Sequence, residues 1–258
     1  MSRKIGLAWL TVKELGPAEQ VSVAAQAGYS HVGLRLVPAV AGQAPLPPFD
    51  ERETERRLAD TGVKVLDVEV FRLAPETDVA AFEPVMAAAA RLRASELLVH
   101  GADPDFARLC DSFARLCELA GKYRLHANLE PMPWVEVSTV AKARRILQGT
   151  SGALLVDAIH FFRADNSFAD LKGAPLRYLQ LCDAPKERPA DMNEIIRQAR
   201  GDRRFPGEGA LDLKGLLKAL PADLPISLEV PHATPMPPLE RARIALSATK
   251  EVLSSGSL

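Results

Sequence analysis

Residues 125–157 read LHANLEPMPWVEVSTVAKARRILQGTSGALLVD, and this stretch decides the fold class. It begins with a short apolar run, Leu125–Glu130, and ends with a second one, Ala153–Asp157. Between them, Ser138–Gln148 places apolar side chains at helical spacing. Short runs rich in Leu and β-branched residues are typical of parallel strands that are buried on both faces. The stretch therefore predicts a strand, a crossover helix and a second parallel strand.

The same unit occurs eight times along the chain. The eight apolar runs are Ile5–Leu10, His31–Leu36, Val63–Val70, Glu96–His100, Leu125–Glu130, Ala153–Asp157, Leu176–Cys182 and Ile226–Val230. The segments predicted to be helical are Pro17–Ala27, Glu51–Thr61, Val79–Arg93, Pro104–Gly121, Ser138–Gln148, Phe168–Lys172, Asp191–Arg200 with Leu211–Leu220, and Pro237–Ser254. Of these segments, the sixth is short and has the weakest pattern.

The spacing of these units favours a closed (β/α)8 TIM barrel that forms a single domain over residues 1–258. The carboxyl ends of successive runs lie 23 to 34 residues apart, and only the last gap is longer, at 49 residues, because of the insertion Pro185–Gly209. Eight βα units in about 250 residues is the usual size of such a barrel. A doubly wound sheet is the competing fold, but no G-x-G-x-x-G follows the first run and no P-loop is present. Pro38–Asp50 is interpreted as a long loop over the barrel mouth.

Composition excludes several classes of function. The chain has 32 Lys and Arg against 33 Asp and Glu, a net charge of -1, which lacks the positive field of a nucleic-acid binder. No apolar run approaches the ~20 residues of a membrane helix, and the first residues carry no signal-peptide pattern. The three cysteines are an odd number without a C-x-x-C pair, as in a reducing compartment. We therefore expect a cytoplasmic protein with a small-molecule substrate and no nucleic-acid or membrane partner. The sequence leaves open whether copies of the chain form a homo-oligomer.

Oxygen-bearing side chains close the last four predicted strands. They are Glu130, Asp157, Gln180 and Glu229. Active sites of TIM barrels lie at the carboxyl ends of the strands, so these side chains are expected to converge. Three converging carboxylates repel one another unless a cation lies between them, and oxygen donors suit a hard or borderline divalent ion. The alternatives are that Asp157 caps the following turn and that Gln180 is an interior amide held by a backbone group.

In their order along the chain, these residues resemble the xylose isomerase-like superfamily of metal-dependent TIM barrels. The resemblance covers nearly the whole chain and rests on Glu130, Asp157-Ala158-Ile159-His160, Gln180-Leu181-Cys182-Asp183-Ala184-Pro185, Pro206-Gly207-Glu208-Gly209 and Glu229. It implies that Glu130, Asp157, Gln180 and Glu229 bind one divalent ion. Mn2+ or Mg2+ is favoured, with Co2+ and Zn2+ as alternatives. It also implies that His160 contacts a substrate oxygen.

The sequence departs from the epimerases of this superfamily at two positions. Many of them present His where this chain has Gln180, and a Gln followed by Leu-x-Asp-Ala-Pro is similar to the 3-dehydroshikimate dehydratase branch. The epimerases also carry an arginine shortly after this strand. Here the nearest cations are Lys186, Arg203 and Arg204, and none matches that position clearly.

Further residues are candidates for substrate contact at the barrel mouth. Trp9 and Trp134 could line the pocket, although Trp9 could equally fill the barrel interior. Arg35 could bind an anionic group or pair with Glu69 on the neighbouring strand. His100 could contact substrate or serve as a structural hydrogen-bonding residue. In the insertion, we expect Lys186 or Arg204 to reach a substrate oxygen or phosphate.

The function that these observations favour is a divalent-metal-dependent isomerase or epimerase of a small sugar or related polyhydroxy carbonyl compound. Its reaction would be proton transfer through an enediolate that the ion stabilises, with Glu130 and Glu229 as acid and base and His160 as a catalytic contact. A 3-dehydroshikimate dehydratase-like lyase is the alternative. A catalytically inactive barrel that serves as a binding subunit is a third interpretation. The apurinic endonuclease branch is disfavoured, because its trinuclear site needs more clustered histidines than the five scattered along this chain.

Overall fold

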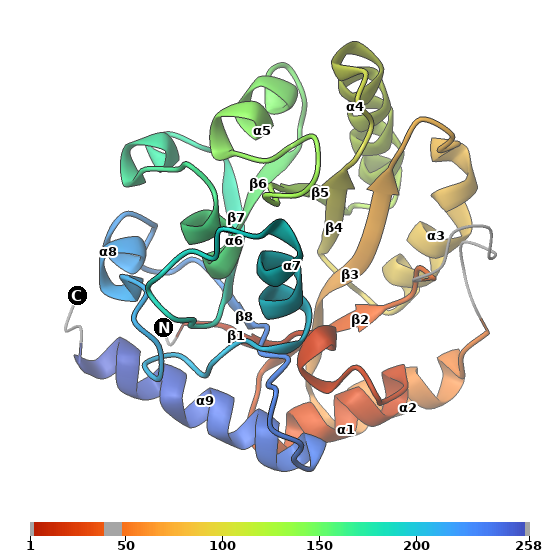
Figure 1. Cartoon of the computed structure of the whole chain (residues 1–258). Helices are drawn as coiled ribbons and strands as arrows, with labels where there is room; N and C mark the ends of the chain where they lie inside the picture. Colours follow the sequence, from red (N-terminus) through yellow and green to blue (C-terminus); the bar gives the residue numbers. More distant parts are fainter. Residues whose placement is uncertain (1–2, 39–47, 256–258) are drawn as a thin grey trace.

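Eight parallel strands close into a barrel in chain order, and β1 completes the circle by pairing with β8 (Figure 1). The computed structural model describes residues 3–38 and 48–255. The strands are β1 Ile5–Leu7, β2 His31–Arg35, β3 Lys64–Leu73, β4 Glu96–Gly101, β5 His126–Glu130, β6 Ala153–Asp157, β7 Leu176–Leu181 and β8 Ile226–Leu228. The (β/α)8 fold predicted from the sequence is confirmed.

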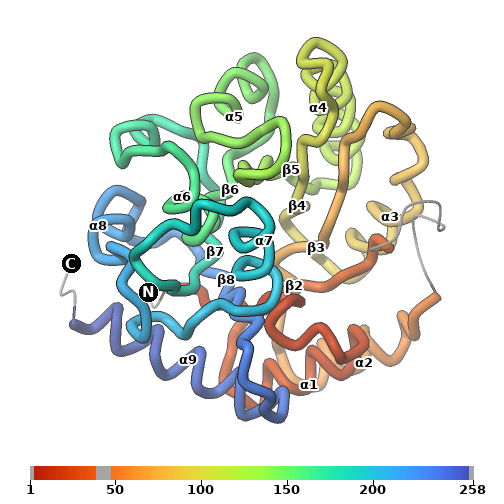
Figure 2. The backbone as a smooth tube through the Cα atoms, viewed as in Figure 1, coloured from red at the N-terminus to blue at the C-terminus, as the bar shows by residue number. Residues whose placement is uncertain are grey.

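Helices surround the barrel and cover its outer face, as the backbone trace in Figure 2 shows. They are α1 Pro17–Ala27, α2 Glu51–Thr61, α3 Glu83–Arg91, α4 Phe106–Lys122, α5 Val140–Leu147, α6 Ala158–Arg163, α7 Met192–Gly201, α8 Leu213–Lys218 and α9 Pro238–Ser255. Short 3-10 helices lie at Trp9–Val12, Val79–Phe82 and Phe168–Leu171. The main apolar core lies between the strands and this layer of helices. No helix in the described part of the chain is long and apolar enough to cross a bilayer.

Capping side chains fix where several helices begin. Asp50, Asp105, Thr139 and Asp212 each accept a hydrogen bond from a backbone N–H in the first turn of the helix that follows. Such caps satisfy donors that have no partner within the helix. They lie close to the starts that helical periodicity predicts, and α1 and α2 have the predicted bounds.

The structure differs from the predicted elements in two places that bear on the site. The first strand ends at Leu7, and Trp9 lies in a 3-10 helix because the chain turns there: the Thr11 hydroxyl donates to the Leu228 carbonyl oxygen. After β6, helix α6 begins at once, whereas the sequence predicted helix only at Phe168–Lys172. Asp157 ends the strand and caps α6, which places His160 on the helix.

Two long connections were expected near the mouth. Residues 39–47 of the predicted loop Pro38–Asp50 lie outside the described residues. The insertion after β7 contains α7, and it contributes Ala199, Arg200 and Arg203 to the cavity described below.

Candidate active site

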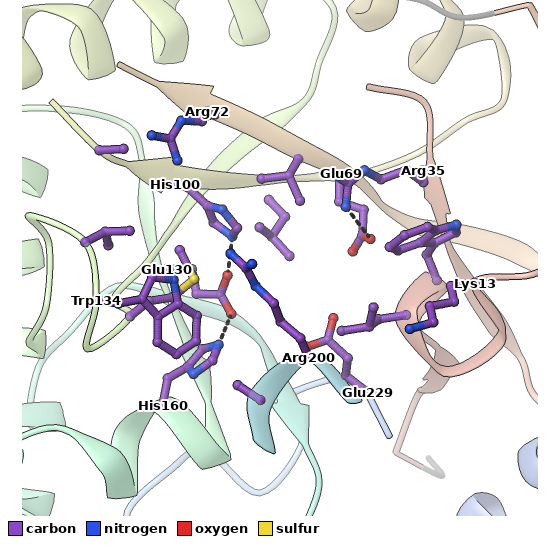
Figure 3. Close-up of a pocket in the computed structure, with 18 of the residues that line it drawn as sticks. Lys13, Arg35, Glu69, Arg72, His100, Glu130, Trp134, His160, Arg200 and Glu229 are labelled. Atoms are coloured by element: carbon purple, nitrogen blue, oxygen red, sulfur yellow. Dashed lines mark hydrogen bonds and ion pairs between the residues drawn. The ribbon is translucent and has the colours of Figure 1, made fainter. Parts of the chain in front are cut away.

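A cavity of about 840 Å³ opens at the carboxyl ends of the strands (Figure 3). Of the site residues predicted from the sequence, those that line it are Trp9, Arg35, His100, Glu130, Trp134, His160 and Glu229. Asp157 and Gln180 lie buried on neighbouring strands, paired in register. The structure thus brings His100, Glu130 and Glu229 to one cavity floor, with Asp157 and Gln180 buried near them.

Glu130 lies at the floor between two imidazoles. Its Oε2 is 2.6 Å from His100 Nε2, and its Oε1 is 3.7 Å from His160 Nε2. Burial, with the charge of Asp157, raises the pKa of the Glu130 carboxyl well above its usual range. Burial also lowers the pKa of both histidines to about 3, and Arg35 adds to this effect at His100. The hydrogen bond to His100 therefore orients the Glu130 carboxyl, and His160 faces its other oxygen.

Asp157 and Glu229 share one buried cation, the guanidinium of Arg203. Nη1 lies 2.6 Å from Asp157 Oδ2, and Nη2 lies 2.7 Å from Glu229 Oε2. Burial alone would raise the pKa of Asp157, but Arg203 and then His160 hold it below its ordinary value. The pKa of Glu229 is raised by burial in spite of Arg203. Gln180 donates from Nε2 to Glu229 Oε1 at 3.0 Å.

The loop after β7 determines which arginine reaches the floor. Asp183 and Arg204 exchange two backbone hydrogen bonds of 2.9 Å, which places Arg203 on the inner side. The Asp183 carboxylate accepts from the backbone N–H groups of Gly207 and Leu211, so it holds the Pro-Gly-Glu-Gly turn against the barrel. At Gly209, any β-carbon would overlap the Asp183 carboxylate. This motif therefore serves to position Arg203.

Donor chemistry and burial at the floor fit a divalent cation. Ligand atoms of Glu130, Asp157 and His160 all lie within 4.8 Å of one another. Gln180 Oε1 is buried without a hydrogen-bond partner, so it is available as an oxygen ligand. Glu229 is not part of that trio, and Arg203 joins it to Asp157. The set of four ligands that the sequence predicted stays a prediction, and His160 is a further candidate ligand.

Aromatic and cationic groups form the walls. The Trp134 ring meets the His160 ring edge to face, with centroids 4.9 Å apart. The Arg35 guanidinium lies 4.7 Å from the centroid of the Trp9 ring and 3.7 Å from Glu69 Oε1, so Arg35 forms the ion pair that was one of its two predicted roles. His100, bonded to Glu130, also has the structural role that the sequence allowed.

Two predicted contact residues lie elsewhere. Lys186 and Arg204 are not among the described residues that line the cavity, and Arg204 donates to the Glu208 carbonyl oxygen instead. The charged lining residues that the predicted set omitted are Lys13, Glu69, Arg72, Glu136, Arg200 and Arg203. Two signals pointed to some of them: Glu69 closes the third apolar run, and Arg203 precedes the Pro-Gly-Glu-Gly motif. For Lys13, Arg72 and Arg200, no pattern separated them from solvent-exposed basic residues.

Three solved structures show the same fold. A xylose isomerase-like TIM barrel/4-hydroxyphenylpyruvate dioxygenase fusion protein is 20% identical with a TM-score of 0.78; the match covers 96% of this chain but only 42% of the fusion protein. D-allulose 3-epimerase from Methylomonas sp. is 17% identical with a TM-score of 0.71, over 97% of this chain and 98% of that one. The 3-keto-D-glucoside 4-epimerase of E. coli is 18% identical with a TM-score of 0.72, over 97% and 100% of the two chains.

Comparison of the sequence with family models identifies the family of this chain. No curated protein sequence matches the chain at a significant level. The family model of the xylose isomerase-like TIM barrel, however, matches residues 21–252, which include strands β2 to β8. The chain therefore belongs to the xylose isomerase-like TIM barrel family.

Proposed function

We propose that the protein is a divalent-metal-dependent isomerase or epimerase of a small polyhydroxy carbonyl compound. The observation that carries this proposal is the buried trio of Glu130, Asp157 and His160 at the floor of a cavity that can hold such a molecule. Similarity to the fold of a D-allulose 3-epimerase and a 3-keto-D-glucoside 4-epimerase supports the substrate class.

The reaction needs one group that removes a proton from the carbon beside a carbonyl and a second group that returns it. Glu130 at the end of β5 and Glu229 after β8 both face the cavity, and Figure 3 shows them on different sides of the Arg200 side chain. In epimerisation, one carboxylate takes the C–H proton from one face, and the other carboxyl delivers a proton to the opposite face. A bound divalent ion would supply polarisation of the carbonyl.

Other residues of the cavity would bind and orient the substrate. His100 holds Glu130 in place by its hydrogen bond, and His160 faces the second oxygen of that carboxyl. The indole of Trp134 offers an apolar wall for the carbon side of a sugar ring. Trp9 and Arg35 form a stacked pair at the wall of the same cavity, where the guanidinium can contact substrate oxygens.

Deuterium exchange tests this chemistry directly. The protein is loaded with MnCl2 and incubated in D2O with ketoses, inososes and 3-dehydroshikimate. We expect deuterium at the carbon beside the carbonyl of the accepted substrate. Glu130→Gln and Glu229→Gln should each reduce the exchange rate at least 100-fold, since general acid–base catalysis contributes about 10²–10⁴-fold. Glu83→Gln is the matched control and should leave the exchange rate unchanged, because Glu83 lies on α3 outside the cavity lining and accepts from the Tyr123 hydroxyl.

The products separate the alternatives. A reversible mixture of isomers of equal mass, apart from deuterium, supports the isomerase or epimerase. An irreversibly dehydrated, unsaturated product would show that the protein is a lyase, like the 3-dehydroshikimate dehydratases whose motif resembles the segment at Gln180. If Mn2+ binds and no compound is turned over or exchanged, the interpretation as a binding subunit replaces both.

A further inference from the structure

The guanidinium of Arg203 is a buried cation with all of its nitrogens engaged. Its side chain is 2% exposed. Besides the two carboxylates, Nε donates to the Ala199 carbonyl oxygen at 2.7 Å and Nη1 donates to the Glu229 carbonyl oxygen at 3.3 Å. The backbone of Arg203 is held as well, because its N–H donates to the Pro231 carbonyl oxygen. Arg203 is therefore fixed in position.

Charge balance at the floor depends on this one residue. Glu69 has Arg35 as its partner, and Glu130 faces the imidazoles of His100 and His160. Asp157 and Glu229 have Arg203. Among the described residues, no other Lys or Arg forms an ion pair with these last two carboxylates. Buried carboxylates without a partner strongly destabilise a fold, so the charge of Arg203 stabilises the arrangement of Asp157 and Glu229.

We infer that Arg203 is a built-in counter-cation whose charge opposes divalent-ion binding to the same carboxylates. The inference rests on the metal site of the proposed function. An ion held by Asp157 or Glu229 would approach a fixed positive charge across a shared carboxylate, and like charges at such distances repel in a buried site. Arg203 thus stabilises the ion-free protein and weakens its affinity for the ion.

Two variants of Arg203 and one control separate the effect of its charge from the effect of its shape. Arg203→Gln removes the charge, and Arg203→Lys keeps it without the planar fork. Arg204→Gln is the matched control, since Arg204 is the next residue and lies outside the cavity lining. Two quantities are measured for each variant: the melting temperature in EDTA, and the Mn2+ affinity by calorimetric titration with MnCl2 alone. Neither measurement needs a substrate.

We expect Arg203→Gln to melt at least 5 °C below wild type in EDTA and to bind Mn2+ at least tenfold more tightly. Arg203→Lys should stay within threefold of the wild-type affinity, and Arg204→Gln should match wild type in both measurements. If Arg203→Gln is unfolded in EDTA, its refolding on addition of MnCl2 supports the inference, and failure to refold there contradicts it.

Weaker or unchanged Mn2+ binding in Arg203→Gln would overturn the inference while leaving the proposed function intact, because Arg203 would then serve to present the ligands. If neither the wild type nor any variant binds Mn2+, the proposed metal site is wrong. The inference that Arg203 opposes ion binding is then wrong as well. If Arg203→Gln melts at the wild-type temperature in EDTA, Arg203 does not stabilise the ion-free protein as a counter-cation.

Discussion

Asp67 on β3 is the least satisfied acidic side chain of the described barrel interior. It is fully buried, and neither carboxylate oxygen has a hydrogen-bond partner. Gly33 lies opposite, where a β-carbon would come within 2.8 Å of Asp67 Oδ1. Burial, and then the charges of Glu69 and Glu96, raise the pKa of Asp67 well above its ordinary value. The native protein therefore retains a proton here that the unfolded chain releases.

We predict that Asp67→Asn stabilises the protein, and that the gain grows with pH. Because the pKa is raised in the folded state, the contribution of Asp67 to stability is fully present below the unfolded-state pKa and declines as pH rises toward the folded-state value. An amide does not titrate, so it avoids this loss. The unfolding free energy of the variant should exceed that of wild type by about 1–3 kcal/mol at pH 8, and by less at pH 5. Urea unfolding at both pH values measures it. Asp111→Asn on the surface of α4 is the control, and an equal gain at both pH values would count against the argument.

Some of the cavity residues could be predicted from the sequence and others could not. Arg35, His100, Glu130 and Glu229 line the cavity as predicted, because strand ends can be read from apolar runs and a strand end specifies where its side chain points. Trp9, Trp134 and His160 also line it, although they lie outside the strands. Arg203 and Arg204 could not be separated in this way. What selects Arg203 is the backbone pairing of Asp183 with Arg204, a contact across 21 residues that no local pattern encodes.

Among the connecting elements, the turn Pro206–Gly209 carries the strictest steric requirement of the site. Its Gly209 lies against the Asp183 carboxylate and the Ala184 carbonyl oxygen, so a methyl group there would overlap both. Gly121 in α4, by contrast, has open space where a β-carbon would be. The two glycines therefore differ in what an added methyl group would do.

Gly209→Ala should lower the unfolding free energy by about 1–3 kcal/mol, as over-packing does in a rigid environment. Gly121→Ala should raise it by about 0.5 kcal/mol, because alanine favours the helical backbone more than glycine does, even in the last turn of α4. Guanidinium chloride unfolding of the two variants beside wild type gives both values. A stable Gly209→Ala protein would mean that the turn can move away from Asp183 at little cost.

Prediction of helices succeeded where an apolar face alternates with a polar one and failed where a short helix is buried on all sides. Helix α4 has 17 residues with a strong apolar face, and the sequence located it. Helix α6 has six residues, begins directly at Asp157 and is buried over most of its length, so it has no polar face to reveal a helical period. Its position still matters for the site, because it carries His160.

Closure of the barrel joins the two ends of the chain. β1 pairs with β8, and Thr11 reinforces this seam: its hydroxyl donates to the Leu228 carbonyl oxygen at 2.7 Å and accepts from the Val230 N–H at 2.8 Å. The count of eight units was predictable from spacing alone. The contacts of Thr11 at this seam were not predictable. Its hydroxyl bonds to Leu228 and Val230, which follow it by 217 and 219 positions in the sequence, and no local pattern encodes such a contact. That the chain is a single domain remains a prediction, and the seam provides its test.

Thr11→Val keeps the shape of the side chain and removes the bridging hydroxyl. It leaves one buried carbonyl oxygen and one buried N–H without a side-chain partner, so we expect a loss of about 1–3 kcal/mol in unfolding free energy. If the chain is a single domain, this local change at the seam lowers the stability of the whole barrel. Urea transitions followed by far-UV circular dichroism and by tryptophan fluorescence should then coincide and shift together. Thr11→Ser, which retains the hydroxyl, should lose less. Transitions that separate in Thr11→Val, with one unshifted, would show that part of the barrel unfolds independently of the seam.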